Sequence, residues 1–159
     1  MRRRRFLKIS LYVLTGVFVC MNLLAFFHSR SFTTFSTIPE VIVDIDNLSF
    51  LHKAKYALSG IDNPRPTKIT ASWMPYETVY IQSNERLECW LIRAQDAKGT
   101  ILMFHGYKAN KSQLLERAEV FNNAGYNTML VDMMGAGGSG GNTVTIGFNE
   151  EKNVRDCYD

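Results

Sequence analysis

The sequence predicts an α/β domain that is preceded by a membrane-spanning helix. Residues 9–27 form a run of 19 without a charged side chain, directly after a basic cluster. From residue 76 onward, patterns typical of strands, turns and helices follow in the order strand, strand, strand, helix, strand, loop, helix. A hairpin followed by a strand–helix–strand unit is typical of a sheet with crossover helices.

The apolar run from Ile9 to Phe27 has the length of a bilayer. A helix rises about 1.5 Å per residue, so this run would span roughly 28 Å. Only Ser10, Thr15 and Asn22 interrupt it, whereas a helix on the surface of a globular core normally carries a polar stripe. The run therefore predicts a transmembrane helix with the lipid bilayer as its partner.

Basic residues cluster on one side of this run, and they are Arg2, Arg3, Arg4, Arg5 and Lys8. Because cationic flanks stay in the cytoplasm, we expect a single-pass protein with a cytoplasmic N-terminus and the bulk of the chain outside. The net charge is +3, but the 13 basic residues after this cluster face 15 acidic ones, which leaves −2. The excess of positive charge therefore comes from the cluster before the apolar run, and it does not indicate nucleic-acid binding.

Two export routes stay open at this stage. The string from Arg3 to Lys8 fits the twin-arginine pattern R-R-x-F-L-K, although Arg2 stands where Ser or Thr is usual. A permanent signal anchor fits better, because the run is long for a signal-peptide core and no A-x-A-like cleavage site follows it. Both routes carry the bulk of the chain out of the cytoplasm.

The chain divides into four predicted parts, which are a basic cytoplasmic tail (1–8), a transmembrane signal anchor (9–27), a linker (28–70) and a partial α/β domain (71–159). Within the linker, Asn47-Leu-Ser49 can cap a short helix that Gly60 ends. Strands are expected at 78–81, 87–92, 100–104 and 128–131, and helices from Ser112 to Gly125 and from Asn149. The strand at 100–104 has no polar face, which predicts a central strand in a mostly parallel sheet.

Three segments of the predicted domain resemble the α/β-hydrolase superfamily. They are residues 99–107, where a buried strand ends in His-Gly-Tyr, then Gly125-Tyr126, and residues 131–139 with the pattern D-x-x-G-x-G-x-S and one extra glycine beside the serine. The sequence looks most like the serine aminopeptidase-like and lysophospholipase-like group. The resemblance covers about residues 76–159, the N-terminal portion of such a domain.

The resemblance implies hydrolysis of an ester or amide bond by a Ser–His–Asp/Glu triad, without a metal or another cofactor. In such enzymes the loop after the strand ending in His-Gly donates one backbone N–H to the oxyanion hole. Carried onto this sequence, that donor is Tyr107, and Gly106 lets the backbone turn tightly. The family's nucleophile follows the strand after the helix that begins at Asn149. We therefore expect a fragment without nucleophile, triad acid or triad histidine.

Two glycine-rich matches in the same loop are weaker. Residues 137–141 spell G-x-S-x-G, but a nucleophile elbow needs a strand directly before it and a helix directly after it. Residues 135–140 spell G-x-G-x-x-G, but a dinucleotide-binding loop must also open a helix. The β-branched sequence at 142–146 is unlike a helix start. We therefore expect Ser139 to be a loop serine. A further interpretation, a nucleotide-dependent oxidoreductase, rests only on the weak G-x-G-x-x-G match.

Two further polar residues follow predicted strands. His105 is interpreted as a structural histidine bonded to loop backbone, and Asp132 as a residue that holds a loop rather than as the triad acid. One alternative function stays open, a complete and non-catalytic membrane-anchored α/β module. The uncovered sheet edge that such a module would present counts against it.

Overall fold

The computed structural model describes residues 2–36, 47–61 and 63–159, which belong to two compact units. The first unit contains residues 2–32, 47–61 and 63, and the second contains 33–36 and 64–159. Residues 64–70 of the expected linker therefore belong to the second unit. Residues 37–46 and 62 of that linker lie outside the described residues.

The first unit begins with helix α1, Arg2–Thr33. It is longer than the predicted 9–27 at both ends, because the basic residues before the run and the polar residues after it also take helical geometry. Its apolar side chains are exposed within the unit, Phe18 to 68% and Met21 to 65%. Among the residues described, α1 is the helix that is long and apolar enough to cross a bilayer, which makes it a candidate membrane span.

The predicted short helix is present as α2, Phe50–Ser59. Ser49 is its N-terminal cap and Gly60, with φ of 79°, is its C-terminal cap. The Ser49 hydroxyl is 2.8 Å from Nδ1 of His52 and makes no side-chain cap hydrogen bond. Two short strands are β1 at Phe35–Ser36 and β2 at Asn63–Pro64.

The second unit is built around a four-stranded sheet, and its order of elements confirms the predicted fold class. The strands are β3 (Glu77–Gln82), β4 (Arg86–Ile92), β5 (Thr100–Phe104) and β6 (Asn127–Val131). The helices are the 3₁₀ helix η1 (Lys111–Leu114), α3 (Leu115–Asn123) and α4 (Glu150–Tyr158).

The strand order β3-β4-β6-β5 corrects two expectations about the sheet. The pairs β3–β4 and β4–β6 are antiparallel and only β5–β6 is parallel, so the described sheet is mixed rather than mostly parallel. The apolar strand β5 lies at its edge, and β6 lies inside. The reason is that the second hairpin strand pairs with β6, on the side of β6 opposite to β5.

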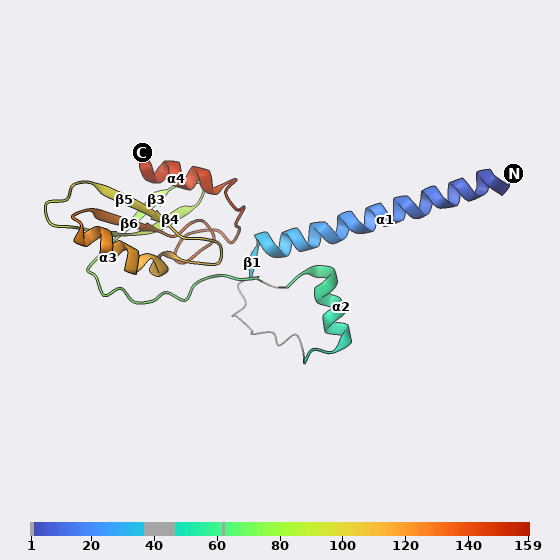
Figure 1. Ribbon diagram of the computed structural model, residues 1–159, viewed down its shortest axis with the longest axis horizontal. Helices are drawn as coiled ribbons and strands as arrows, with labels where there is room; N and C mark the ends of the chain where they lie inside the picture. The colour runs from blue at the N-terminus through green and yellow to red at the C-terminus, as the bar shows by residue number, and fades with distance from the viewer. Residues whose placement is uncertain (1, 37–46, 62) are drawn as a thin grey trace. The chain divides into compact units, whose positions relative to one another are not determined.

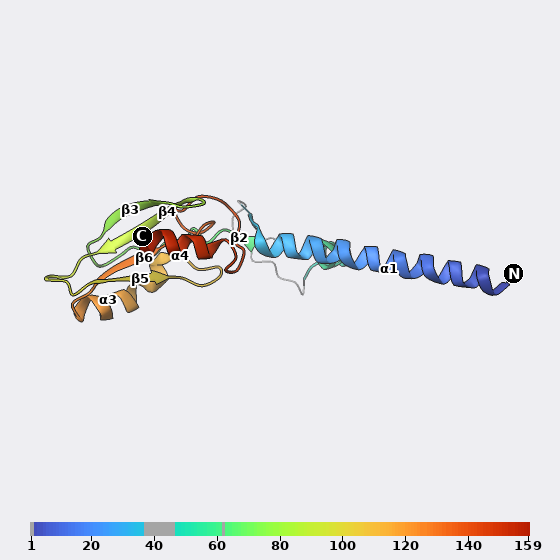
Figure 2. The ribbon, with the colours of Figure 1, turned by 90° about the horizontal axis from the view of Figure 1, so that it is seen from above.

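Helices cover both faces of this sheet, with α3 on one side and α4 on the other (Figures 1 and 2). The core on the α3 side contains Trp90, Ile92, Met103, Leu114, Leu115, Ala118 and Leu130. The core on the α4 side contains Leu87, Cys89, Met129, Val131 and Cys157. At about 25 cal/mol per Å² of buried apolar surface, these two layers are the main stabilising contribution to the unit. They fix the carboxyl ends of β5 and β6 beside each other.

Candidate active site

The loop after β5 and the loop after β6 meet at one edge of the sheet. Phe104 and Val131, the last residues of these parallel strands, are register partners. His105 and Asp132 therefore emerge side by side at the carboxyl edge, where open α/β sheets form their binding sites. This is the edge at which the sequence places the candidate oxyanion-hole residues Gly106 and Tyr107.

His105 holds both loops through its two ring nitrogens. Nε2 accepts a hydrogen bond from the backbone N–H of Met133 at 3.0 Å, so Nε2 carries no proton. Nδ1–H then donates to the carbonyl of Gly106 at 2.8 Å. Burial lowers the pKa of His105 below its ordinary value, which also favours the neutral ring. These contacts agree with a structural histidine.

The tight turn after His105 spans Gly106 to Ala109, whose N–H donates to the Gly106 carbonyl at 3.2 Å. The positive φ in this turn, 58°, falls on Lys108. Gly106 has no positive φ, and a Cβ added there would meet nothing within 4 Å. The backbone conformation of Gly106 therefore does not require glycine, and the role expected for this residue stays a prediction.

A pocket of about 230 Å³ opens beside this turn. Its lining is mostly apolar and comes from the loops after β5 and β6, the segment before α4, and β1. The lining residues are Phe35, His105, Gly106, Tyr107, Lys108, Ala109, Met133, Met134, Ala136, Val144, Ile146, Gly147 and Glu150. The rings of Phe35 and Tyr107 stack with their centroids 6.2 Å apart. The predicted oxyanion-hole loop thus forms part of the wall of an apolar pocket.

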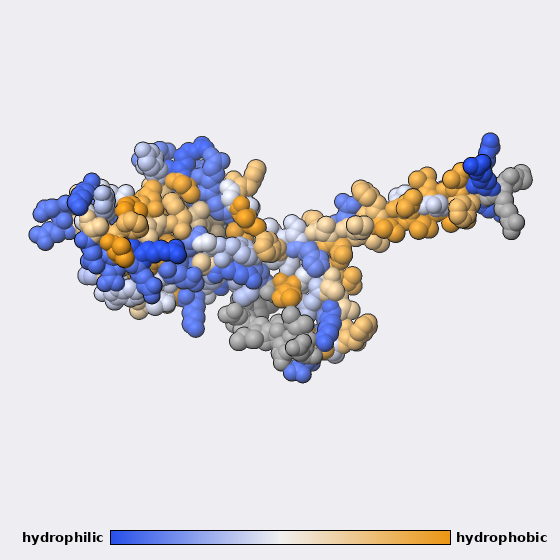
Figure 3. Space-filling view, viewed as in Figure 1, coloured by the Kyte–Doolittle hydropathy of each residue, from blue (hydrophilic) through white to orange (hydrophobic). Residues whose placement is uncertain are grey.

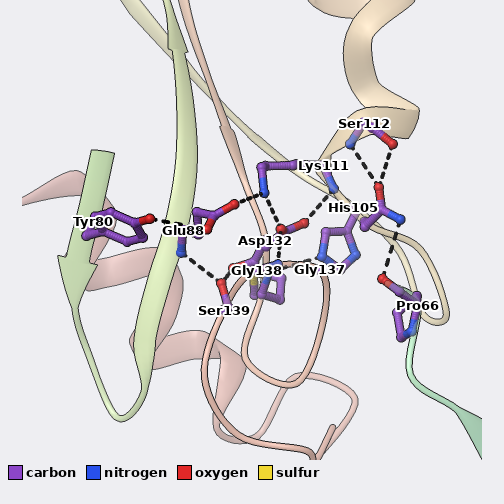
Figure 4. Close-up of polar contacts among 12 residues, drawn as sticks. Pro66, Tyr80, Glu88, His105, Lys111, Ser112, Asp132, Gly137, Gly138 and Ser139 are labelled. Atoms are coloured by element: carbon purple, nitrogen blue, oxygen red, sulfur yellow. Dashed lines mark hydrogen bonds and ion pairs between the residues drawn. The ribbon is translucent and has the colours of Figure 1, made fainter. Parts of the chain in front are cut away.

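Asp132 is fully buried and ties the glycine-rich loop to the start of η1 (Figure 4). Its Oδ1 accepts from the N–H of Lys111 at 2.7 Å, and its Oδ2 accepts from the N–H of Gly138 at 2.8 Å. The Lys111 ammonium also pairs with Oδ2. These three donors belong to loop backbone and to Lys111, which agrees with the loop-holding interpretation.

Lys111 is the cation of a buried cluster that the sequence does not reveal. Its Nζ lies 2.7 Å from Oε1 of Glu88 and 4.8 Å from the centroid of the Trp90 ring, in addition to the ion pair with Asp132. The side chain is fully buried. Its neighbour Asn110 caps η1, where its Oδ1 accepts from the N–H of Ser112 at 3.0 Å. The N-terminal cap of η1 is therefore Asn110.

Ser139 is buried in the glycine-rich loop (Figure 4). Its hydroxyl donates to the carbonyl of Asp132 at 2.6 Å and accepts from the N–H of Glu88 at 2.8 Å. The guanidinium of Arg65 donates hydrogen bonds to the carbonyls of Gly141 at 2.6 Å and Gly137 at 3.3 Å. Since backbone groups use the hydroxyl as donor and as acceptor, Ser139 has the contacts of a loop serine.

Glu150 is the buried acid that faces the pocket from the first turn of α4. Burial raises its pKa, but hydrogen bonds from Thr145 and Gly147 outweigh burial and leave the pKa below its ordinary value. Oε1 accepts from the N–H of Thr145 at 2.7 Å, and Oε2 accepts from its hydroxyl at 2.6 Å and from the N–H of Gly147 at 2.9 Å. The carboxylate is therefore held as the anchor of the loop before α4.

Within the described parts of the chain, no group of three His, Cys, Asp or Glu side chains could hold a metal ion. The sequence also gave no signal for Arg65, Glu88 or Glu150. Their partners lie in loops or, for Glu88, at the start of η1, at positions that no periodicity links to them.

Comparison with known proteins gives a partial likeness. No family model matches the chain, and no curated protein matches it. Among solved structures, an esterase from Pyrococcus furiosus is 23% identical with a TM-score of 0.49, over 59% of this chain and 40% of that one. An α-beta serine hydrolase homologue from Coxiella burnetii is 19% identical with a TM-score of 0.43, over 57% of this chain and 46% of that one.

An α-beta hydrolase from Vibrio vulnificus is 16% identical with a TM-score of 0.45, over 52% of this chain and 28% of that one. The chain thus spans 40% of the length of the esterase and less of some other solved structures. At identities under 25% and TM-scores under 0.5, this likeness assigns no activity to the chain.

Proposed function

We propose that this chain is the membrane-anchored N-terminal portion of a serine hydrolase that cleaves an ester or amide bond through a Ser–His–Asp/Glu triad. The observation that carries the proposal is the apolar pocket beside the turn from Gly106 to Ala109, at the carboxyl edge of β5. In this proposal the turn supplies half of an oxyanion hole. The nucleophile, the triad acid and the triad histidine belong to chain outside residues 1–159.

The proposed chemistry assigns each part of this site one task. The serine hydroxyl attacks the substrate carbonyl, the histidine takes its proton, and negative charge develops on the carbonyl oxygen. The backbone N–H of Tyr107 would stabilise that charge, as a donor held by a turn whose shape is fixed before the substrate arrives. The turn is held by His105 through the Gly106 carbonyl.

The pocket suggests the chemical class of the group that binds there. Its apolar walls include Met133, Met134 and Val144. The carboxylate of Glu150 is engaged by Thr145 and Gly147, so it is not a separate charge offered to a ligand. These features favour an uncharged, apolar acyl or leaving group.

The α1 helix is the basis of the anchoring part of the proposal. It is long and apolar enough to span a bilayer, and its basic residues all precede the apolar run apart from Arg30. The charge asymmetry favours a cytoplasmic N-terminus and a hydrolase domain outside the cytoplasm.

A fluorophosphonate probe tests this function on the protein isolated from its native membranes with an antibody against residues 71–159. The probe reacts with a serine that a neighbouring base and an oxyanion hole activate. We expect one labelled serine, in a peptide outside residues 1–159, and no label on Ser139. Label on Ser139 would contradict the site described above. A protein without any labelled serine, while hydrolases in the same membranes react, would favour the non-catalytic anchored module.

A further inference from the structure

Helix α2 exposes an apolar face that no described residue of its own unit covers. Phe50 is 82% exposed, Leu51 78% and Leu58 64%, and no residue of α2 is buried. At 3.6 residues per turn these three side chains lie on one side of the helix, together with Ala54. Exposed apolar side chains gathered on one helix face usually mark an interaction surface.

The remaining faces of α2 are polar and positively charged. Lys53 and Lys55 are exposed, as is His52, and residues 47–60 contain no Asp or Glu. Helices that lie in the interface between a membrane and water typically carry phenylalanine and leucine on one face and lysines beside it.

The C-terminal end of α2 is bonded to the C-terminal turns of α1 within the same unit. Nε2 of His28 lies 2.9 Å from the carbonyl of Ala57, and the Ser31 hydroxyl donates to the carbonyl of Ile61. A Cβ added at Gly60 would come within 2.6 Å of Cβ of Ser31, so the two segments approach closely there. His28 is the first residue after the apolar run. These contacts place the end of α2 at the level where the candidate span would leave the hydrocarbon.

The direction of α2 also fits a membrane surface. In Figure 1, α2 crosses the direction of α1 instead of running along it. Figure 3 shows pale orange side chains on the edge of α2 that lies toward the N-terminal end of α1. A helix that crosses a span near its end, with its apolar side turned toward the span's other end, faces the bilayer.

We propose that α2 is an interfacial helix that lies on the bilayer leaflet from which α1 emerges. Phe50, Leu51 and Leu58 insert into the boundary between headgroups and acyl chains, about 5–10 Å deep. Lys53 and Lys55 contact anionic headgroups, which adds attraction at low ionic strength. This inference rests on the proposed anchoring by α1. It adds a second membrane contact to the proposed anchor.

Fluorescent probes on the full chain in vesicles test this proposal. An environment-sensitive fluorophore is attached to Phe50→Cys on the apolar face or to His52→Cys on the opposite face, in a Cys20→Ala background. Cys89 and Cys157 are buried and compete little for the label. A third variant, Val17→Cys, reports whether α1 is inserted. Vesicles contain phosphatidylcholine with or without phosphatidylglycerol, and the quenchers are an acyl-chain nitroxide and aqueous iodide.

We expect the nitroxide to quench the probes at positions 17 and 50, and iodide to quench the probe at position 52. If the probe at 17 is lipid-quenched while those at 50 and 52 respond equally to iodide, the anchoring stands and the interfacial helix is wrong. If iodide reaches position 17, both proposals fail. Protection of position 50 from both quenchers would indicate a protein contact, such as a second copy, and would also overturn the proposal.

Discussion

Asp132 is fully buried, yet its carboxylate is not isolated, because the N–H groups of Lys111 and Gly138 and the Lys111 ammonium surround it. A carboxylate without such partners would be too costly to keep ionised in the core. The same three donors come from η1 and from the glycine-rich loop. One buried acid therefore fixes the two loops that continue from β5 and β6, and with them one wall of the pocket.

Replacing Lys111 by Met should destabilise the second unit strongly. The substitution leaves Asp132 and Glu88 without their cation, and breaking a buried ion pair costs about 3–5 kcal/mol. The measurement is the free energy of unfolding in urea, followed by tryptophan fluorescence of the full chain in detergent. Lys152→Met is the matched control, since its exposed pair with Asp156 is worth about 0.2–1 kcal/mol. Equal losses in both variants would contradict the role given to Lys111.

His105 should make the stability of the fold depend on pH. Its ordinary pKa is 6.5, and burial lowers the pKa in the folded chain. Below pH 6.5 the unfolded chain therefore binds more protons at this residue, and stability is lost as the pH falls. We expect a larger loss of unfolding free energy between about pH 7.5 and pH 5.5 in the wild type than in His105→Gln. Parallel losses in the two proteins would show that His105 is not held neutral.

At the scale of elements, the sequence predicted most of the second unit because its signals are local. Apolar and polar side chains alternate along the hairpin that turns at Ser83-Asn84-Glu85. Strands β5 and β6 are largely apolar runs, and Gly125, with a φ of 87°, ends the helical pattern between them. Strand order was not predictable in the same way. Pairing of β4 with β6 is a contact between residues about 40 positions apart, and nothing local to either strand specifies it.

The candidate site was predictable only where a motif carries it. Gly106 and Tyr107 follow a recognisable strand ending, and the structure places both at the pocket. The residues that hold the loops, Arg65, Lys111 and Glu150, look like ordinary surface charges in the sequence. Their roles come from contacts such as Arg65 with Gly141, which are 76 positions apart.

Gly137→Ala tests the packing of the glycine-rich loop against Asp132. Gly137 has a φ of 47°, and an added Cβ would overlap the Asp132 carboxylate. The backbone strain alone costs about 1–3 kcal/mol, and the overlap adds to it. Gly99→Ala is the control, because its φ is ordinary and nothing lies within 4 Å of an added Cβ. Thermal melting should shift clearly for Gly137→Ala and little for Gly99→Ala. Similar melting of both variants would argue against the buried network.

At the scale of the whole molecule, a candidate membrane span precedes the unit that contains the candidate site. The charge asymmetry around residues 9–27 predicts that the second unit lies outside the cytoplasm. A reporter that fluoresces only when folded in the cytoplasm, fused after Asp159, should therefore stay dark, while a reporter that requires export should be active. The reverse pattern would overturn the orientation. Replacing Arg3 and Arg4 by Lys distinguishes the two export routes, since only a twin-arginine substrate should then be retained in the cytoplasm.

We propose that the turn after β5 stabilises an oxyanion through the backbone N–H of Tyr107. The rate at which the native membrane protein reacts with a fluorophosphonate tests it most directly. Tyr107→Pro removes the N–H, so labelling should slow by about 10²–10³-fold, whereas Tyr107→Phe keeps the donor and should react at nearly the wild-type rate. Melting curves of both variants check that the fold is intact. If folded Tyr107→Pro reacts as fast as Tyr107→Phe, the loop is not the oxyanion hole and the proposed site is wrong.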